Sequence, residues 1–236
     1  MPERPDPIAA AREILKRHSI FGSLTVAELD QLLAHARIET YRAKRPIFLK
    51  GSPGRGLLTV LKGRVRISCV GPDGSVVLLA DMGEGEVFGE IALLDGKDRT
   101  ADATALADCE LLAVDRRDFV PFLKANPDVA LRLLVVLCDR LRRTTEQYED
   151  VIFLEGPARL AKKLLQLGEA YRQRTALGTR PGLKVSQRDL GNMIGLSRES
   201  INKQLSAWHR SGTIRVGRTG IVILDDAALR AYAEGD

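Results

Sequence analysis

The sequence predicts an α+β fold in which a β-roll of the jelly-roll type precedes one long helix and a C-terminal winged helix–turn–helix. Three observations lead to this prediction. Residues 38–115 alternate short β-rich runs with glycines, residues 186–210 hold two short helical patterns around Gly195, and an apolar repeat with helical spacing lies between them. We expect domain boundaries that separate residues 1–125, 126–156 and 157–236.

Two short helices are expected ahead of the β-rich region, over residues 8–18 and 25–36. In the second, apolar side chains recur at helical spacing at Leu29, Leu32 and Leu33. Thr25 is a suitable N-cap because Glu28 follows three residues later, as in a capping box.

The β-rich region contains runs such as Leu58–Leu61, Val65–Val70 and Val76–Ala80, which are separated by turn sequences such as Gly71-Pro-Asp-Gly74. Short strands with frequent turn signals are typical of an all-β roll or barrel. The turn glycines alone do not distinguish a roll that binds a ligand from an empty β-sandwich.

A long helix is expected to begin at Asn126-Pro127-Asp128, with asparagine as N-cap and proline at the first helical position, and to end before Gly156-Pro157. Residues spaced alternately by three and four form a seam along it: Leu131, Leu134, Cys138, Leu141, Thr145, Tyr148 and Ile152. This spacing favours a parallel dimer, in which polar seam residues could touch a ligand. The alternative is a helix that packs on its own domain.

The C-terminal third reads as a helix over residues 158–174, a loop over 175–181, helices over 186–196 and 197–210, and two β-rich runs around Gly217–Gly220. This is the order of a winged helix–turn–helix. From residue 157 onward, fourteen Lys and Arg face seven Asp and Glu, a net +7, which leaves −2 for residues 1–156 out of a formal total of +5. Such a basic segment suits a polyanion, although a solvated basic surface has the same composition.

The composition also bounds the location and the metal chemistry. The three cysteines lie far apart, so neither a zinc site nor a disulfide framework is expected, and a reducing cytoplasm is the simplest location. No apolar run approaches the length of a membrane span, and the first residues are polar and rich in proline, so we expect an unexported protein.

The first motif with chemical content runs from Phe88 to Ala101. Gly89 allows a close backbone approach, Glu90 can accept from sugar hydroxyls, and Arg99 offers a planar fork to a phosphate. A strand that ends at Gly89 and is followed by a helical turn would leave free amides near an anion, and Thr100 would add a hydroxyl. Together these residues fit a cyclic nucleotide.

The second motif opens the helix at 197–210. Ser197 is a good N-cap, while Arg198 shares a face with Asn202, and Glu199 with Lys203. Arginine and lysine can bind guanine, and glutamate can accept from cytosine. Apolar residues on the opposite side face the core, namely Ile201, Leu205 and Trp208, and Ser186 with Asp189 starts the supporting helix. The alternative is an exposed charged face on which Glu199 and Lys203 pair with each other.

With these motifs in this order, the chain resembles the family of cyclic AMP receptor proteins and their anaerobic and nitrogen-fixation relatives over nearly its whole length. The resemblance implies a ligand site that includes Gly89, Glu90, Ile91, Ala92, Arg99, Thr100, Arg140, Thr144 and Thr145. In it, Gly89 and Glu90 meet the ribose, Arg99 and Thr100 the phosphate, and the hydroxyls of Thr144 and Thr145 the adenine. Arg140 matches an arginine near Glu90.

The resemblance also implies that double-stranded DNA is bound by Ser186, Gln187, Arg188, Ser197, Arg198, Glu199, Asn202 and Lys203. The family pattern Arg-Glu-x-x-x-Arg becomes Arg198, Glu199 and Lys203, so a preference related to TGTGA half-sites is implied but changed opposite residue 203.

These inferences predict a homodimeric, non-enzymatic transcription regulator controlled by cyclic AMP, with RNA polymerase as a partner. Cyclic GMP remains an alternative ligand, because a threonine at position 100 could serve a guanine 2-amino group. Three further hypotheses are a ligand-independent regulator, a pure ligand-binding scaffold and an enzyme acting on cyclic nucleotides. No cluster or nucleophile–base pair suits turnover. We expect no metal, haem or iron–sulfur cluster, because no cysteine precedes Cys69 and the three histidines are poorly placed for haem.

Overall fold

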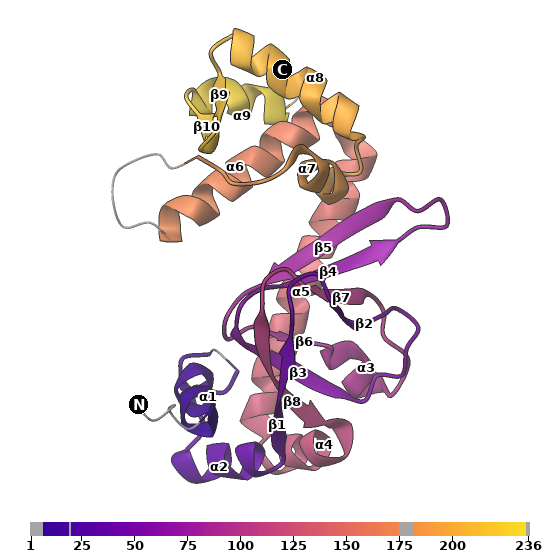
Figure 1. Cartoon of the computed structure of the whole chain (residues 1–236), viewed down its shortest axis with the longest axis vertical. Coiled ribbons are helices and arrows are strands. Elements are labelled where there is room, and N and C mark those ends of the chain that lie inside the picture. The colour runs from indigo at the N-terminus through magenta and orange to yellow at the C-terminus, as the bar shows by residue number, and fades with distance from the viewer. Residues whose placement is uncertain (1–6, 19, 175–181, 235–236) are drawn as a thin grey trace. The chain divides into compact units, whose positions relative to one another are not determined.

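The computed structural model describes residues 7–18, 20–174 and 182–234 (Figure 1). Contacts within the chain divide it into two compact units. The first extends to Leu141 apart from residues 75–77, and the second begins at Arg142 and includes residues 75–77. The loop expected at residues 175–181 lies outside the described residues.

The first unit opens with helices α1 (Pro7–Lys16) and α2 (Val26–Ala34). The expected capping box is confirmed, because the Thr25 hydroxyl accepts from the Glu28 amide and the Glu28 carboxylate accepts from the Thr25 amide. Leu29, Leu32 and Leu33 are buried, as their spacing predicts.

The predicted β region forms two four-stranded antiparallel sheets, with strand orders β1-β8-β3-β6 and β2-β7-β4-β5. The strands are β1 (Ala36–Tyr41), β2 (Pro46–Phe48), β3 (Gly56–Lys62), β4 (Val65–Val70), β5 (Val76–Met82), β6 (Val87–Phe88), β7 (Asp102–Ala105) and β8 (Cys109–Asp115). The short helix α3 (Glu90–Asp95) follows β6, as the motif at Gly89 predicts.

Strand β8 shows how the two faces of its sheet are used. Leu111 and Ala113 join a cluster that includes Val65 and Ala103 of the second sheet, so they face the interior of the roll. Leu112 and Val114 join a different cluster with α1, α2 and α4 (Arg116–Ala125). Because successive strand residues point to opposite faces, the same strand supports both cores.

The long helix α5 runs over Pro127–Phe153, but Asn126 does not have the expected role. Its side-chain amide donates to the Phe122 carbonyl and therefore caps the end of α4. One residue separates the two helices, and its side chain serves the free carbonyls of the first rather than the amides of the second.

The two sides of α5 differ in burial. Val129 and Leu133 are buried in the core that the leading helices share. The seam is exposed in the single chain, with Leu131 at 61% and Leu141 at 68% of their full accessibility. The remaining seam residues are also exposed: Leu134, Cys138, Thr145, Tyr148 and Ile152. The seam therefore does not pack on the part of its own chain that the structure describes.

The second unit consists of α6 (Gly156–Arg174), α7 (Gln187–Ile194), α8 (Arg198–Arg210), β9 (Ile214–Gly217), β10 (Gly220–Ile223) and α9 (Asp226–Glu234). β9 and β10 pair as the predicted hairpin. Helices α6, α7 and α8 share one core with the hairpin and with Leu229 of α9. The order helix, helix–turn–helix and wing is confirmed, and α9 adds a last helix that the sequence pattern did not predict.

Candidate functional site

The turn between β6 and α3 is built around Gly89, which has the left-handed backbone torsion φ of 80°. Glycine adopts this region without steric cost. The turn places Glu90 at the first position of α3 with only 3% of its surface exposed. A carboxylate this deeply buried requires a partner.

Arg140 of α5 supplies that partner. Its Nη1 lies 2.7 Å from Oε1 of Glu90, and its Nη2 also donates to the carbonyl of Val87. One guanidinium therefore joins the strand before the turn to the helix after it. The expected proximity of Arg140 and Glu90 is present in the structure.

Arg99 approaches the same turn from the segment before β7 and is only 7% exposed. Its Nη1 donates to the carbonyl of Gly89 at 2.8 Å, and its Nη2 donates to the carbonyl of Gly56 at 2.9 Å. The guanidinium carbon lies 4.2 Å from the centre of the Phe48 ring, a cation–π distance. Burial lowers the pKa of Arg99, and the nearby carboxylate of Glu90 acts in the opposite direction.

Two details show how closely Arg99 is fitted to the turn. A Cβ at position 89 would lie 2.3 Å from its Nη1, so only glycine leaves room for the guanidinium. Among the described residues, the buried Nε of Arg99 has no hydrogen-bond partner. No described carboxylate lies within ion-pair distance of this arginine. The buried cation thus keeps one donor unused and lacks a paired anion.

The remaining predicted ligand residues are distributed more widely. Ala92 is buried against Gly54, while the side chains of Ile91 and Thr100 are exposed. Thr144 and Thr145 are exposed on the part of α5 that belongs to the second unit. Their roles toward a ligand remain predictions.

A small hollow of about 120 Å³ adjoins Arg99, and the sequence did not indicate its lining. Arg37, Glu39 and Tyr41 alternate along β1 and line this hollow together with Phe48 and Gly56. The Tyr41 hydroxyl donates to Glu39 at 2.7 Å, and burial is the main cause that raises the Tyr41 pKa to about 12. The alternating polar residues of β1 were the available signal.

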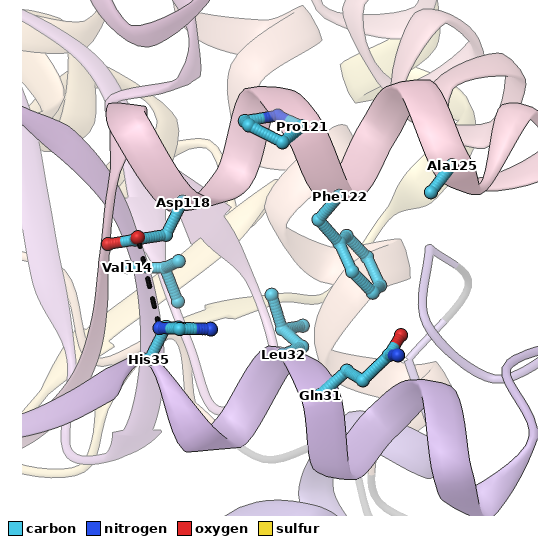
Figure 2. A pocket seen from close by; sticks show the side chains of 8 residues that line it. All are labelled: Gln31, Leu32, His35, Val114, Asp118, Pro121, Phe122 and Ala125. Atoms are coloured by element: carbon cyan, nitrogen blue, oxygen red, sulfur yellow. Dashed lines mark ion pairs between the residues drawn. The ribbon is translucent and has the colours of Figure 1, made fainter.

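A larger hollow of about 280 Å³ lies between α2 and α4 (Figure 2). Leu32 and Phe122 form apolar walls, and at one end the His35 ring faces Asp118 with 3.8 Å between Nδ1 and Oδ1. None of the predicted ligand-binding residues lines this hollow, so we do not include it in the candidate site.

In the second unit, serine caps fix the starts of the two helices of the helix–turn–helix. The Ser186 hydroxyl accepts from the Asp189 amide at 3.0 Å, and the Ser197 hydroxyl accepts from the Ser200 amide at 3.1 Å. Gly195, with a φ of 70°, makes the turn between α7 and α8. The predicted core stripe of α8 is confirmed, since Ile201, Leu205 and Trp208 are all buried.

The opposite face of α8 presents its polar residues to solvent. The predicted DNA-binding residues on this helix are exposed, namely Arg198, Glu199, Asn202 and Lys203. Within the described part of the chain, Glu199 and Lys203 form no ion pair, so the alternative of a mutually neutralised face is not what the structure contains. Ser186 and Arg188 are likewise exposed near the start of α7, whereas Gln187 is partly buried and donates to Asn202.

Comparison with known proteins places these two regions in one family. A model of the cyclic nucleotide-binding domain matches residues 38–126, and a model of the Crp-like helix-turn-helix domain matches residues 158–232. A CRP-like cAMP-activated global transcriptional regulator of Mycobacterium tuberculosis is 31% identical over 221 residues, which cover 94% of this chain and 99% of the relative. The chain belongs to the CRP-like family of cyclic nucleotide-binding transcription regulators.

A second relative agrees with this assignment, and a solved structure shares the fold. The cyclic AMP receptor protein of Thermus thermophilus is 33% identical and covers 94% of this chain and 99% of its own length. A solved structure of the c-di-GMP responsive regulator CLP of Xanthomonas campestris shares the fold, with a TM-score of 0.74, 23% identity and coverage of 84% and 99% of the two chains. The family consists of transcription regulators, not enzymes.

Two further features of the described residues concern metals and membranes. These residues contain no group of three or more His, Cys, Asp and Glu side chains arranged to hold a metal ion. In this part of the chain, no helix combines the length and apolar character that a membrane crossing needs.

Proposed function

We propose that the chain is a homodimeric transcription regulator that binds cyclic AMP in its β-roll and, in response, binds palindromic DNA related to TGTGA half-sites. The observation that carries the ligand half of this proposal is the state of Arg99. Its guanidinium is buried, lacks a paired carboxylate among the described residues and keeps a free Nε donor. A buried cation of this kind is stabilised by an anion that enters with the ligand.

The chemistry of the turn supports a cyclic nucleotide as that anion. A cyclic phosphate can accept from the Nε of Arg99 while the carbonyls of Gly56 and Gly89 hold the other two nitrogens. One oxygen of the Glu90 carboxylate pairs with Arg140, and the carboxylate can still accept hydrogen bonds from sugar hydroxyls. The phosphate would thus meet the positive Arg99 and the sugar the negative Glu90, nine residues apart in the sequence.

The choice of cyclic AMP rests on the relatives and on two threonines. The relatives from Mycobacterium tuberculosis and Thermus thermophilus are named for cyclic AMP. By resemblance, Thr144 and Thr145 supply hydroxyls to adenine, one from each protomer. Cyclic GMP is the alternative that keeps the same phosphate and ribose contacts, and c-di-GMP is named for a fold neighbour.

The exposed seam of α5 supports the homodimer. Its apolar residues have no cover within the described chain, and its spacing of three and four suits a parallel helix pair. Cys138 lies on this seam and offers a direct test. In a parallel dimer its two copies face each other, so mild oxidation should join the protomers covalently, whereas Cys138→Ser should remain uncrosslinked. A wild-type protein that stays monomeric at micromolar concentration would contradict the dimer.

The DNA half of the proposal rests on α8 and its basic surroundings. In a dimer, two α8 helices would enter successive major grooves about 34 Å apart. The break between α5 and α6, near residues 153–157, is the hinge that would set their spacing. Because ligand and DNA then favour the same state, each should raise the affinity for the other by the same factor. We further expect a cytoplasmic protein that contacts RNA polymerase.

Isothermal titration with cyclic AMP, cyclic GMP and c-di-GMP, with and without a TGTGA-type palindrome, tests the whole proposal. We expect heat with cyclic AMP at the lowest concentration and tighter binding when DNA is present. No heat with any nucleotide would leave a ligand-independent regulator. Binding that DNA does not alter would leave a ligand-binding scaffold. Loss of cyclic AMP during the incubation would indicate an enzyme.

A further inference from the structure

A side-chain hydrogen bond joins the two helices of the helix–turn–helix on their exposed side. The Nε2 of Gln187, the first residue of α7, donates to the Oδ1 of Asn202 on α8 at 3.2 Å. Both helices are fixed near this point, since Ser186 and Ser197 cap their starts and Leu190 and Ile201 are buried beneath them. The bond therefore links two rigid elements.

This bond determines how the Asn202 amide faces the solvent. Its Oδ1 is turned toward α7 and accepts from Gln187, so the Nδ2 group is the end left to project outward. Among the described residues, this Nδ2 has no partner. Asn202 lies one turn after Arg198 on the same exposed face, which is the face proposed to meet DNA. It thus offers donor hydrogens rather than the usual pair of donor and acceptor.

The orientation matters because asparagine normally reads adenine with both ends of its amide. Its oxygen accepts from adenine N6, and its nitrogen donates to adenine N7. The Asn202 oxygen is held toward Gln187 and so is turned away from the base, which leaves only the nitrogen placed to contact a base edge. This nitrogen is suited to bases that present acceptors in the major groove, which are guanine, with N7 and O6, thymine, with O4, and adenine, with N7. Cytosine, which presents a donor, is the base it suits least.

We propose that Gln187 is a positioning residue that orients Asn202 as a donor, so that cytosine is selected against at the base opposite Asn202. This inference rests on the proposed DNA-binding function and assigns the specificity of one base position within it. A net hydrogen bond of ordinary strength corresponds to a discrimination of about 3- to 10-fold at that position.

Reversing the hydrogen bond gives the sharpest test. In Gln187→Glu the carboxylate can only accept, so it should engage the Nδ2 of Asn202 and turn the Oδ1 outward. The selection should then reverse, so that cytosine and adenine, which present a donor, are favoured and guanine and thymine are disfavoured. The added negative charge should weaken binding to all sequences similarly. Asn192→Asp is the matched control, since it also adds one negative charge to α7 and Asn192 is not among the predicted DNA-binding residues.

The measurement is binding-site selection from a palindrome with randomised half-sites, using the full-length protein with millimolar cyclic AMP and without it. Support requires three results. Asn202→Ala should flatten the preference at one position only, Gln187→Glu should reverse the preference at that position, and Asn192→Asp should leave it unchanged. If the wild type selects a defined site and Gln187→Glu selects the same bases at every position, this inference is wrong while the proposed DNA binding stands. A wild-type protein that selects no sequence would overturn it together with the proposed DNA binding.

Discussion

The charged groups at the Gly89 turn and those on α8 are treated in opposite ways. Glu90 and Arg99 are buried, and each already has partners within the protein, namely Arg140 for the carboxylate and two backbone carbonyls for the guanidinium. Glu199 and Lys203 are exposed and make no ion pair in the described residues. A buried charge without partners costs several kcal/mol, whereas an exposed one is satisfied by water.

This contrast separates stability from recognition. Removing a partner near Gly89 should affect both folding and ligand binding, because the group left behind stays buried. Removing a charge from α8 should affect DNA binding alone. Single substitutions in the two regions test that separation, and the largest effect is expected at Arg140.

Arg140→Ala should lower the free energy of unfolding by about 3 kcal/mol, because it leaves the Glu90 carboxylate buried without its cation. Urea denaturation of the ligand-free protein measures this change. Arg143→Ala, an exposed arginine on the same helix, is the control and should change stability by less than about 0.5 kcal/mol. Equal effects of the two substitutions would show that the ion pair does not stabilise the first unit.

Arg99→Ala should weaken cyclic AMP binding by about 10- to 100-fold, since it removes charge-assisted hydrogen bonds to the phosphate. The cyclic AMP affinity of Arg99→Lys should lie between those of the wild type and Arg99→Ala, because lysine keeps the charge but loses the planar fork. Titration calorimetry measures both affinities. Arg117→Ala removes an arginine whose side chain is 83% exposed, and it should bind as the wild type does. Wild-type affinity in Arg99→Ala would refute the phosphate contact.

Glu199→Ala should reduce discrimination between cognate and altered half-sites by about 1–3 kcal/mol while the unfolding transition stays unchanged. Competition gel shifts against single-base variants measure the discrimination. In the comparison variant Lys203→Ala, a phosphate contact would instead weaken binding to every sequence and reduce its salt dependence. If Glu199→Ala weakens all sequences equally, residue 199 positions the helix and does not read a base.

The smallest effect is expected from His18, whose pKa burial lowers below its usual value. The unfolded chain then takes up a proton at this residue before the folded one does. The free energy of unfolding should therefore fall as the pH drops below about 6.5. His18→Asn should flatten this part of the stability curve, measured by thermal unfolding between about pH 7.5 and 5. An identical slope in the variant would assign the pH dependence to other groups.

The elements that the sequence predicted best are those whose ends are marked by turn glycines or helix caps. Glycines marked the ends of the strands in the roll, and serine or threonine caps marked the starts of α2, α7 and α8. These signals are readable because a turn or a cap is formed by only a few neighbouring residues. Helix α4 was missed because Pro121 interrupts its pattern. Asn126 was assigned to the wrong helix, since a residue between two adjacent helices can cap either one and the sequence does not say which.

The site was predicted in part for a similar reason. Gly89, Glu90 and Arg99 lie close in sequence and meet in the structure, and the resemblance supplied Arg140. The carbonyl of Gly56 and the ring of Phe48 were not predictable as partners of Arg99. Every residue carries a carbonyl, so a backbone acceptor 43 positions away leaves no mark in the sequence. The Gln187–Asn202 bond depended in the same way on how two helices meet.

The space kept open at Gly89 links two positions that could otherwise change independently. A side chain there would displace the guanidinium of Arg99, and the left-handed backbone opposes it as well. If Arg99 were replaced by a small residue, only the backbone restriction would remain, and asparagine, which tolerates that conformation, would become admissible at position 89. In related sequences that lack the arginine at position 99, we therefore expect substitutions of the glycine at position 89.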